Sequence, residues 1–189
     1  MTGDPSQEVP GAPPTQLGPD WVPGPDGVPF RRGARVLLVD EHDRLLMVCG
    51  HDLDKPERRW WFTVGGGVDA GETARAAALR EVLEETGLRL DPSRIVGPVA
   101  RRRGQFAFLM QTVRQDEEFF FARVHEAGDL STAGWTDIER AFMDDLRWWD
   151  LDELEAVAEE VFPVDLVPLV RHLLQGWDGV VRTLVEEHA

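Results

Sequence analysis

The stretch GGGVDAGETARAAALREVLEETGL, residues 65–88, places an acidic helix directly after three glycines. Glu81, Glu84 and Glu85 recur at a spacing that brings side chains onto one side of a helix, about one turn apart. Like charges at this spacing repel each other. The pattern therefore predicts that something close to the helix compensates three convergent carboxylates.

The expected helix covers roughly residues 73–86. Thr73 is suited to the N-cap, where a hydroxyl accepts a bond from the first turn. Gly87 is suited to the position after the helix, where the chain turns left-handed. At 100° per residue, one face collects Leu79, Val82, Leu83 and Thr86, and the three glutamates lie on the opposite side.

The glycines that precede the helix change how its charges are interpreted. An acidic helix by itself is most often a solvated face. Gly65, Gly66 and Gly67 allow unusual backbone angles and close approach, so backbone carbonyls and carboxylates can meet in one place. Clustered oxygen ligands suit Mg²⁺ or Mn²⁺, and such an ion would relieve the repulsion.

The same stretch resembles the signature of the Nudix hydrolase family of MutT-like proteins. That signature is Gly, five residues, Glu, seven residues, Arg-Glu, an aliphatic residue, any residue, Glu-Glu, any residue, Gly and an aliphatic residue. The matching positions are Gly66, Glu72, Arg80, Glu81, Val82, Glu84, Glu85, Gly87 and Leu88. The flanking strand pattern extends the resemblance over about residues 33–155.

The resemblance implies an α/β fold, an α/β/α sandwich around a mixed sheet, and hydrolysis of a nucleoside diphosphate linked to another moiety. It implies Mg²⁺ or Mn²⁺ as cofactor. Glu84 and Glu85 resemble the main metal ligands, and Glu81 resembles a further ligand or the general base. Catalysis is thus expected to rest on Glu81 and Glu84, and Gly65 is expected to offer a carbonyl ligand.

Three further residues of the signature are expected to support the site. Arg80 and Glu72 resemble an internal pair that orients helix and loop, and Gly66 is the signature glycine. Val64 stands where many relatives have proline. Relatives often supply another carboxylate from outside the helix, and the candidates are Glu139, Asp144 and Asp145, among which the sequence does not choose.

Substrate contacts are expected outside the signature. Arg101 and Arg103 belong to a basic run that is able to bind phosphates, or that protects an exposed sheet edge. On a strand these residues alternate faces, so at most two of Arg101, Arg102 and Arg103 point the same way. Aromatic residues able to stack on a base, or to pack in the core, are Trp60, Trp61, Phe106, Phe108 and Trp135.

Composition limits the partners of the chain. Its 189 residues carry a formal net charge of -15, which argues against nucleic-acid binding through phosphate neutralisation. No apolar run is long enough for a membrane span, and no secretion signal is recognised. The single cysteine, Cys49, lies in an apolar stretch and reads as a buried hydrophobe. A cytoplasmic protein is expected.

Three parts are expected along the chain. Residues 1–29 form a Pro/Gly-rich arm, in which Trp21 is more simply part of a loose tail than docked on the domain. Residues 30–162 form the Nudix domain. Residues 163–189 form a helical extension packed on it.

Local patterns predict the elements within these parts. A hairpin is expected over 34–40 and 44–50, and strands over 60–64, 94–113 and 117–126. A short helix or ordered loop is expected over 136–145. Further helices are expected over 150–162, 164–177 and, as a possibility, the last twelve residues.

Two other functions compete with hydrolysis. A non-catalytic nucleotide-binding module of the same family is the main alternative, although its expected mark, loss of the glutamates, is absent. An isoprenoid diphosphate isomerase would need a reactive cysteine, and Cys49 sits in an apolar strand instead. The sequence does not name the substrate. A homodimer is plausible because the terminal helices are unassigned.

Overall fold

A computed structural model describes residues 17–18, 20–108, 111–125 and 128–185. Nine strands form a mixed sheet in which seven follow the order β7-β3-β4-β2-β6-β5-β9, while β1 pairs with β2 and β8 with β4. The strands are β1 (Val22–Pro23), β2 (Pro29–Val39), β3 (Leu45–His51), β4 (Arg59–Gly67), β5 (Ile95–Phe108), β6 (Gln111–Arg123), β7 (Met143–Trp149), β8 (Glu160–Phe162) and β9 (Arg182–Thr183).

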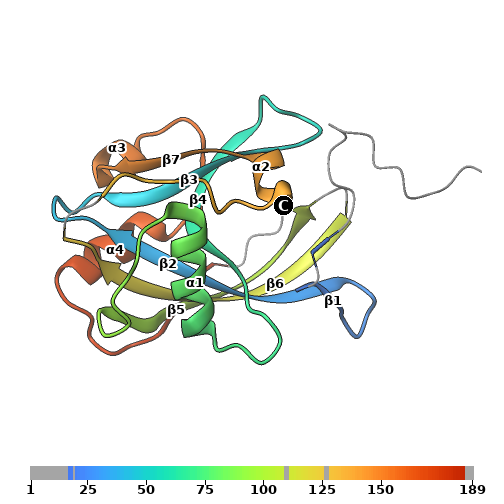
Figure 1. Ribbon diagram of the computed structural model, residues 1–189, viewed down its shortest axis with the longest axis horizontal. Coiled ribbons are helices and arrows are strands. Elements are labelled where there is room, and N and C mark those ends of the chain that lie inside the picture. Colours follow the sequence, from blue (N-terminus) through green and yellow to red (C-terminus); the bar gives the residue numbers. More distant parts are fainter. Residues whose placement is uncertain (1–16, 19, 109–110, 126–127, 186–189) are drawn as a thin grey trace, which may run out of the picture.

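Helices cover both faces of this sheet (Figure 1). They are α1 (Ala74–Thr86), α2 (Asp137–Phe142), α3 (Leu151–Glu155) and α4 (Leu166–Leu174). Side chains alternate across β2, so Val36 and Leu38 join the core under α1, and Leu37 and Val39 join the core under α3 and α4. The expected α/β/α sandwich with a mixed sheet is confirmed.

The central strand β2 positions the site because it pairs on both sides. It runs antiparallel to β4, where Arg35 is opposite Gly65, and parallel to β6, where Gly33 is opposite Glu117. The parallel pairing joins segments more than eighty residues apart in the chain. Polar residues of β2 and β6 therefore lie next to the glycines that lead into α1.

The hairpin expected between β2 and β3 forms only at its turn. Its two strands meet at a single pair, Val39 with Leu45. Beyond this pair β3 diverges and runs between β4 and β7, because its apolar residues are buried on both sides. The predicted turn between β2 and β3 is thus confirmed, but along most of its length β3 pairs with β4 and β7 instead of β2.

The expectations for the C-terminal third need two corrections. The helix expected over 150–162 ends at Glu155, and 160–162 forms β8, which runs parallel to β4. The segment after α4 contains strand β9, parallel to β5, where a further helix was a possibility. In both places a short strand joins the sheet instead of extending a helix. Residues 186–189 lie outside the described residues.

The expectation of a loose tail is wrong for the end of the N-terminal arm. Trp21 stacks on Phe108 with ring centroids 6.2 Å apart, and the guanidinium of Arg31 lies over the Trp21 ring at 4.4 Å. Val22 and Pro23 form β1 against the start of β2. An aromatic partner on β5 and a cationic partner on β2 hold Trp21 in place. Residues 1–16 lie outside the described part.

Within the described residues, no helix has the length and apolar character needed to cross a membrane.

Candidate active site

Helix α1 begins and ends where the sequence predicts. The Thr73 hydroxyl accepts a hydrogen bond from the Ala76 N–H, and Gly87 follows with φ 75°. The buried side chains are Ala74, Ala77, Ala78, Glu81, Val82, Glu85 and Thr86. The expected opposition of an apolar and an acidic face therefore needs correction, because small alanines let α1 sink onto the sheet and Glu81 and Glu85 are buried beside β4.

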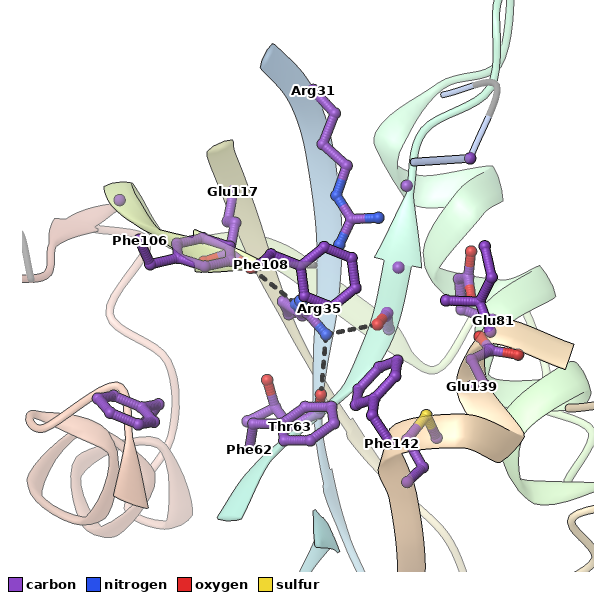
Figure 2. Close-up of a pocket in the computed structure, with 18 of the residues that line it drawn as sticks. Arg31, Arg35, Phe62, Thr63, Glu81, Phe106, Phe108, Glu117, Glu139 and Phe142 are labelled. Carbon is purple, nitrogen blue, oxygen red and sulfur yellow. Dashed lines mark hydrogen bonds and ion pairs between the residues drawn. The ribbon is translucent and has the colours of Figure 1, made fainter. Parts of the chain in front are cut away.

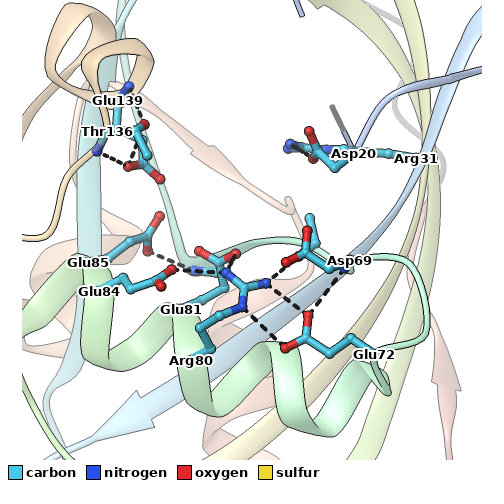
Figure 3. Close-up of polar contacts among 12 residues, drawn as sticks. Asp20, Arg31, Asp69, Glu72, Arg80, Glu81, Glu84, Glu85, Thr136 and Glu139 are labelled. Atoms are coloured by element: carbon cyan, nitrogen blue, oxygen red, sulfur yellow. Dashed lines mark hydrogen bonds and ion pairs between the residues drawn. The ribbon is translucent and has the colours of Figure 1, made fainter. Parts of the chain in front are cut away.

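Arg80 compensates part of the acidic cluster (Figure 3). Its guanidinium contacts Glu72 at 3.0 Å, Glu81 at 2.7 Å and Glu84 at 2.9 Å, and also donates to the Gly67 carbonyl at 2.9 Å. The internal pair of Arg80 and Glu72 is thus formed. It fixes the turn that leads into α1 and raises the pKa of Arg80, with Glu72 as the leading cause.

The three glycines are the end of strand β4 rather than a loop. Gly65 has φ 133°, and a side chain there would collide with the carbonyl oxygen of Ala34 on β2. A Cβ on Gly66 would lie 2.6 Å from the carboxylate of Glu81. Only glycine allows the strand to pass this close to both β2 and the helix.

Gly65 is held on both sides. Its N–H donates to Oε2 of Glu85 at 2.8 Å, which fixes the carboxylate against β4. Its carbonyl accepts a hydrogen bond from Nη1 of Arg35. This carbonyl, expected to be a metal ligand, is therefore already engaged by a guanidinium, and any metal would have to share it.

A third carboxylate reaches the helix from α2. Glu139 caps α2, since its side chain accepts from the Thr136 N–H at 2.6 Å. The preceding loop is fastened to the end of α1, where the Trp135 ring N–H donates to the Glu85 carbonyl at 2.9 Å. Ligand oxygens of Glu81, Glu85 and Glu139 consequently lie within 4.8 Å of one another.

Of the three acids that the sequence left open, the structure brings one close to the glutamates of α1. Asp144 pairs with His51 at 3.1 Å and with Arg59 at 3.3 Å, and Asp145 is exposed on β7. Neither belongs to the cluster around Glu85, whereas Glu139 does.

The cluster is short of positive charge. Burial, and then the neighbouring charge of Glu81, raise the pKa of Glu85 well above its ordinary value. Burial also raises the pKa of Glu81, although Arg80 opposes this. Glu84, in contrast, is half exposed at the rim beside Arg80.

The donor set fits a hard divalent cation. Three carboxylates from two helices converge, two of them buried, and each offers the oxygen ligands that Mg²⁺ and Mn²⁺ prefer. A divalent ion at this point would replace the missing positive charge. Among the described residues, Glu81, Glu85 and Glu139 lie close enough together to hold it, whereas Glu84, also expected as a ligand, lies outside this group and pairs with Arg80.

A cavity of about 790 Å³ opens from the carboxylates across the sheet (Figure 2). Its walls include several aromatic side chains, among them Trp21, Trp60, Phe62, Phe106, Phe108 and Phe142. Phe62 stacks near Phe142 at 6.3 Å, and Phe108 meets Phe142 edge-on at 5.6 Å. Flat apolar walls beside a cluster of oxygen ligands suit a ligand that joins a planar ring to a phosphate chain.

The floor of the cavity is charged and buried. Glu117 of β6 accepts from Arg35 at 2.7 Å and from Arg102 at 2.7 Å. Burial raises the pKa of Glu117, but the two guanidiniums outweigh it and lower that pKa to about 2. Arg31 lines the same floor and pairs with Asp20 at 2.9 Å.

The expected substrate residues divide between this cavity and other places. Trp60 and Phe106 line the cavity. Arg101 and Arg103 do not: they point to the other face of β5 and pair with Glu118 and Asp116. Strand alternation brings the middle arginine, Arg102, inward instead. Trp61 and Trp135 are buried in the two cores.

Sequence reasoning missed the buried floor. Arg31, Arg35 and Glu117 lie in strands with no motif, and only the pairing of β2 with β6 brings them together. No local signal sets them apart, because Arg31 is next to Arg32 and Glu117 lies in the polar first half of β6.

Comparison with known proteins decides the family. The model of the NUDIX domain matches residues 29–170. The chain belongs to the Nudix hydrolase family. Its acidic helix is therefore the family's signature helix, and the enzyme class is that of hydrolases acting on phosphoric anhydride bonds.

Curated relatives of this Nudix hydrolase carry several substrate names. An RNA pyrophosphohydrolase of Bartonella henselae is 28% identical over 151 residues, which are 69% of this chain and 82% of the relative. An oxidized purine nucleoside triphosphate hydrolase of Danio rerio is 33% identical over 100 residues, 48% of this chain and 61% of the relative.

Solved structures share the fold. A MutT protein of Bacillus halodurans aligns with a TM-score of 0.56 and 23% identity, covering 81% of this chain and 88% of the other. An Ap4A hydrolase of C. elegans aligns with a TM-score of 0.56 and 15% identity, covering 77% and 98%. At these identities the likeness speaks for the architecture alone.

Proposed function

We propose that this Nudix hydrolase is a Mg²⁺- or Mn²⁺-dependent pyrophosphohydrolase that cleaves a diphosphate bond in a nucleoside diphosphate linked to another moiety. The observation that carries the proposal is the convergence of Glu81, Glu85 and Glu139 at one end of an aromatic cavity. The carboxylates suit a metal ion that would bind the diphosphate, and the cavity suits the remainder of the substrate.

The residues divide the reaction between them. When bound, the divalent ion supplies charge neutralisation at the phosphate oxygens and acidifies a water molecule. Arg80 holds Glu81 and Glu84 in place, and Gly65 fixes Glu85. Glu84 lines the rim of the same cavity, and in this proposal it accepts the proton of the attacking water. Water oxygen bonds to one phosphorus, the bridging P–O bond breaks, and the leaving phosphate keeps its electron pair.

The test is a hydrolysis screen of nucleoside triphosphates, dinucleoside polyphosphates and nucleotide sugars with Mg²⁺ and Mn²⁺. We expect turnover that depends on metal and falls about 100-fold or more in Glu85→Gln and in Glu139→Gln, because each loses several kcal/mol of charge stabilisation. Glu155→Gln is the matched control, since Glu155 is exposed on α3 and pairs with Arg171.

Two results would contradict the proposal. Full activity in Glu139→Gln would mean that Glu139 of α2 does not take part in the metal centre. Absence of turnover on every compound, with nucleotide binding retained, would favour the non-catalytic binding module.

A further inference from the structure

The carboxylate in the cavity floor has no capacity left for a ligand. Oε1 of Glu117 accepts from Arg35 and Gln115, and Oε2 accepts from Nε of Arg102 and pairs with its Nη2. A carboxylate offers about four lone-pair positions, so these donors fill it. Glu117 therefore holds the guanidiniums in place and does not itself receive hydrogen bonds from a ligand.

The guanidiniums keep donors that are not used. Arg35 donates a hydrogen bond from Nε to Glu117 and hydrogen bonds from Nη1 to backbone carbonyls of β4. Arg31 donates a hydrogen bond from Nε to Gln115 and another from Nη1 to Asp20. The Nη2 group of each arginine has no partner among the residues that the structure describes. Burial, and then the charge of Arg35, lower the pKa of Arg31, which agrees with two cations held close together.

The donors lie between aromatic walls. The Arg35 guanidinium lies over the Phe62 ring at 5.8 Å, Phe108 lines the same cavity (Figure 2), and Trp21 lies under the Arg31 guanidinium. A planar ring fits between such walls, and an edge turned toward Arg31 and Arg35 would meet their Nη2 groups. The ring must consequently present acceptors at that edge.

We propose that this cavity is a base subsite selective for unmodified 6-oxopurines, guanine or hypoxanthine, with O6 and N7 facing Arg31 and Arg35. These two adjacent acceptors are the pair that an arginine reads bidentately. The inference rests on the proposed function only in taking the base to be joined to a diphosphate at the carboxylate cluster.

Two related rings are disfavoured by the same donors. Adenine has an amino group where guanine has O6, so an N–H would face an N–H. An 8-oxopurine carries a hydrogen on N7, which turns that acceptor into a donor. Glu117 is already filled, so it is not available to accept either hydrogen.

Binding, rather than turnover, tests the subsite. We would titrate the protein, with Mg²⁺, against the non-hydrolysable α,β-methylene diphosphates of guanosine, inosine, adenosine and 8-oxoguanosine. Guanosine and inosine compounds are expected to bind about tenfold or more tightly than the other two. Equal affinities, or preference for the adenosine or 8-oxo compound, would overturn the proposal.

The variant Arg31→Met tests whether Arg31 is responsible for the base selectivity. Arg101→Met, on the face of β5 that points away from the cavity, is the matched control. Arg31→Met is expected to weaken guanosine binding about tenfold while adenosine binding changes less than threefold, which also shows that the variant is folded. An equal loss for all four compounds would mean that Arg31 binds phosphate, contrary to the proposal.

The two proposals fail in different ways. Base selectivity without turnover of any substrate would refute the hydrolase and leave the subsite. Metal-dependent turnover with no base preference would refute the subsite and leave the hydrolase.

Discussion

Two buried glutamates, Glu117 and Glu85, line the same cavity and differ in the charge of the groups around them. Glu117 lies between Arg35 and Arg102, which outweigh the effect of burial and lower its pKa to about 2. Glu85 is equally enclosed, but burial and the charge of Glu81 raise its pKa well above the ordinary value. One carboxylate has its countercharge built into the chain, and the other does not.

The difference indicates in which part of the cavity the protein itself compensates the buried negative charge. A buried charge is tolerated when it is paired and fully hydrogen-bonded. The floor around Glu117 meets that condition with protein groups alone. The ionised cluster around Glu85 has no such partner in the chain, so a cation would stabilise its charged form, which is the physical argument for a metal there and against one at the floor.

The largest expected effect comes from removing the paired charge. Glu117→Gln leaves Arg35 and Arg102 without their carboxylate and is expected to lower the free energy of unfolding by about 3–5 kcal/mol. Glu85→Gln, in metal-free buffer, is expected to lower it little or to raise it. Urea unfolding of both variants with EDTA measures the contrast, and equal losses would contradict it.

Metal is expected to have the next largest effect. At 100 times its dissociation constant, Mg²⁺ stabilises the fold by about 2.7 kcal/mol through linkage, which raises the melting temperature by roughly 5–10 °C. The shift is expected to disappear in Glu85→Gln and to persist in Glu155→Gln. Thermal melts with and without Mg²⁺ provide the measurement, and a melting temperature that ignores both Mg²⁺ and Mn²⁺ would count against the site.

The smallest expected effect is on the pH dependence of stability. The folded pKa of Glu85 is raised, so the metal-free native state holds a proton that the unfolded chain releases above about 4.5. Stability should fall as pH rises from there through the folded pKa, by up to about 1.4 kcal/mol per pH unit.

Glu117 should contribute the opposite slope at lower pH. Its pKa is lowered to about 2, so its stabilisation is full above about 4.5 and is lost as pH falls toward 2. Urea midpoints between pH 3 and pH 8 in EDTA separate the two slopes. Glu85→Gln should flatten the upper one, and an unchanged profile in that variant would assign the slope to another group.

Local sequence rules predicted the part of the site that lies on one element. The spacing of the glutamates, the Thr73 cap and the Gly87 stop depend on neighbours within one or two turns. The internal pair of Arg80 and Glu72 followed from resemblance to the Nudix signature. These features survive in the structure because nothing distant has to be known to place them.

The sequence by itself thus determined the family, the signature helix and the chemistry that its carboxylates favour. Only the tertiary structure decided that Glu139 joins them, that Arg102 faces the cavity in place of Arg101 and Arg103, and that Arg31, Arg35 and Glu117 form one floor. The reason is physical: helix caps and helical spacing act over a few residues, whereas strand pairing joins β2 to β6 across most of the domain.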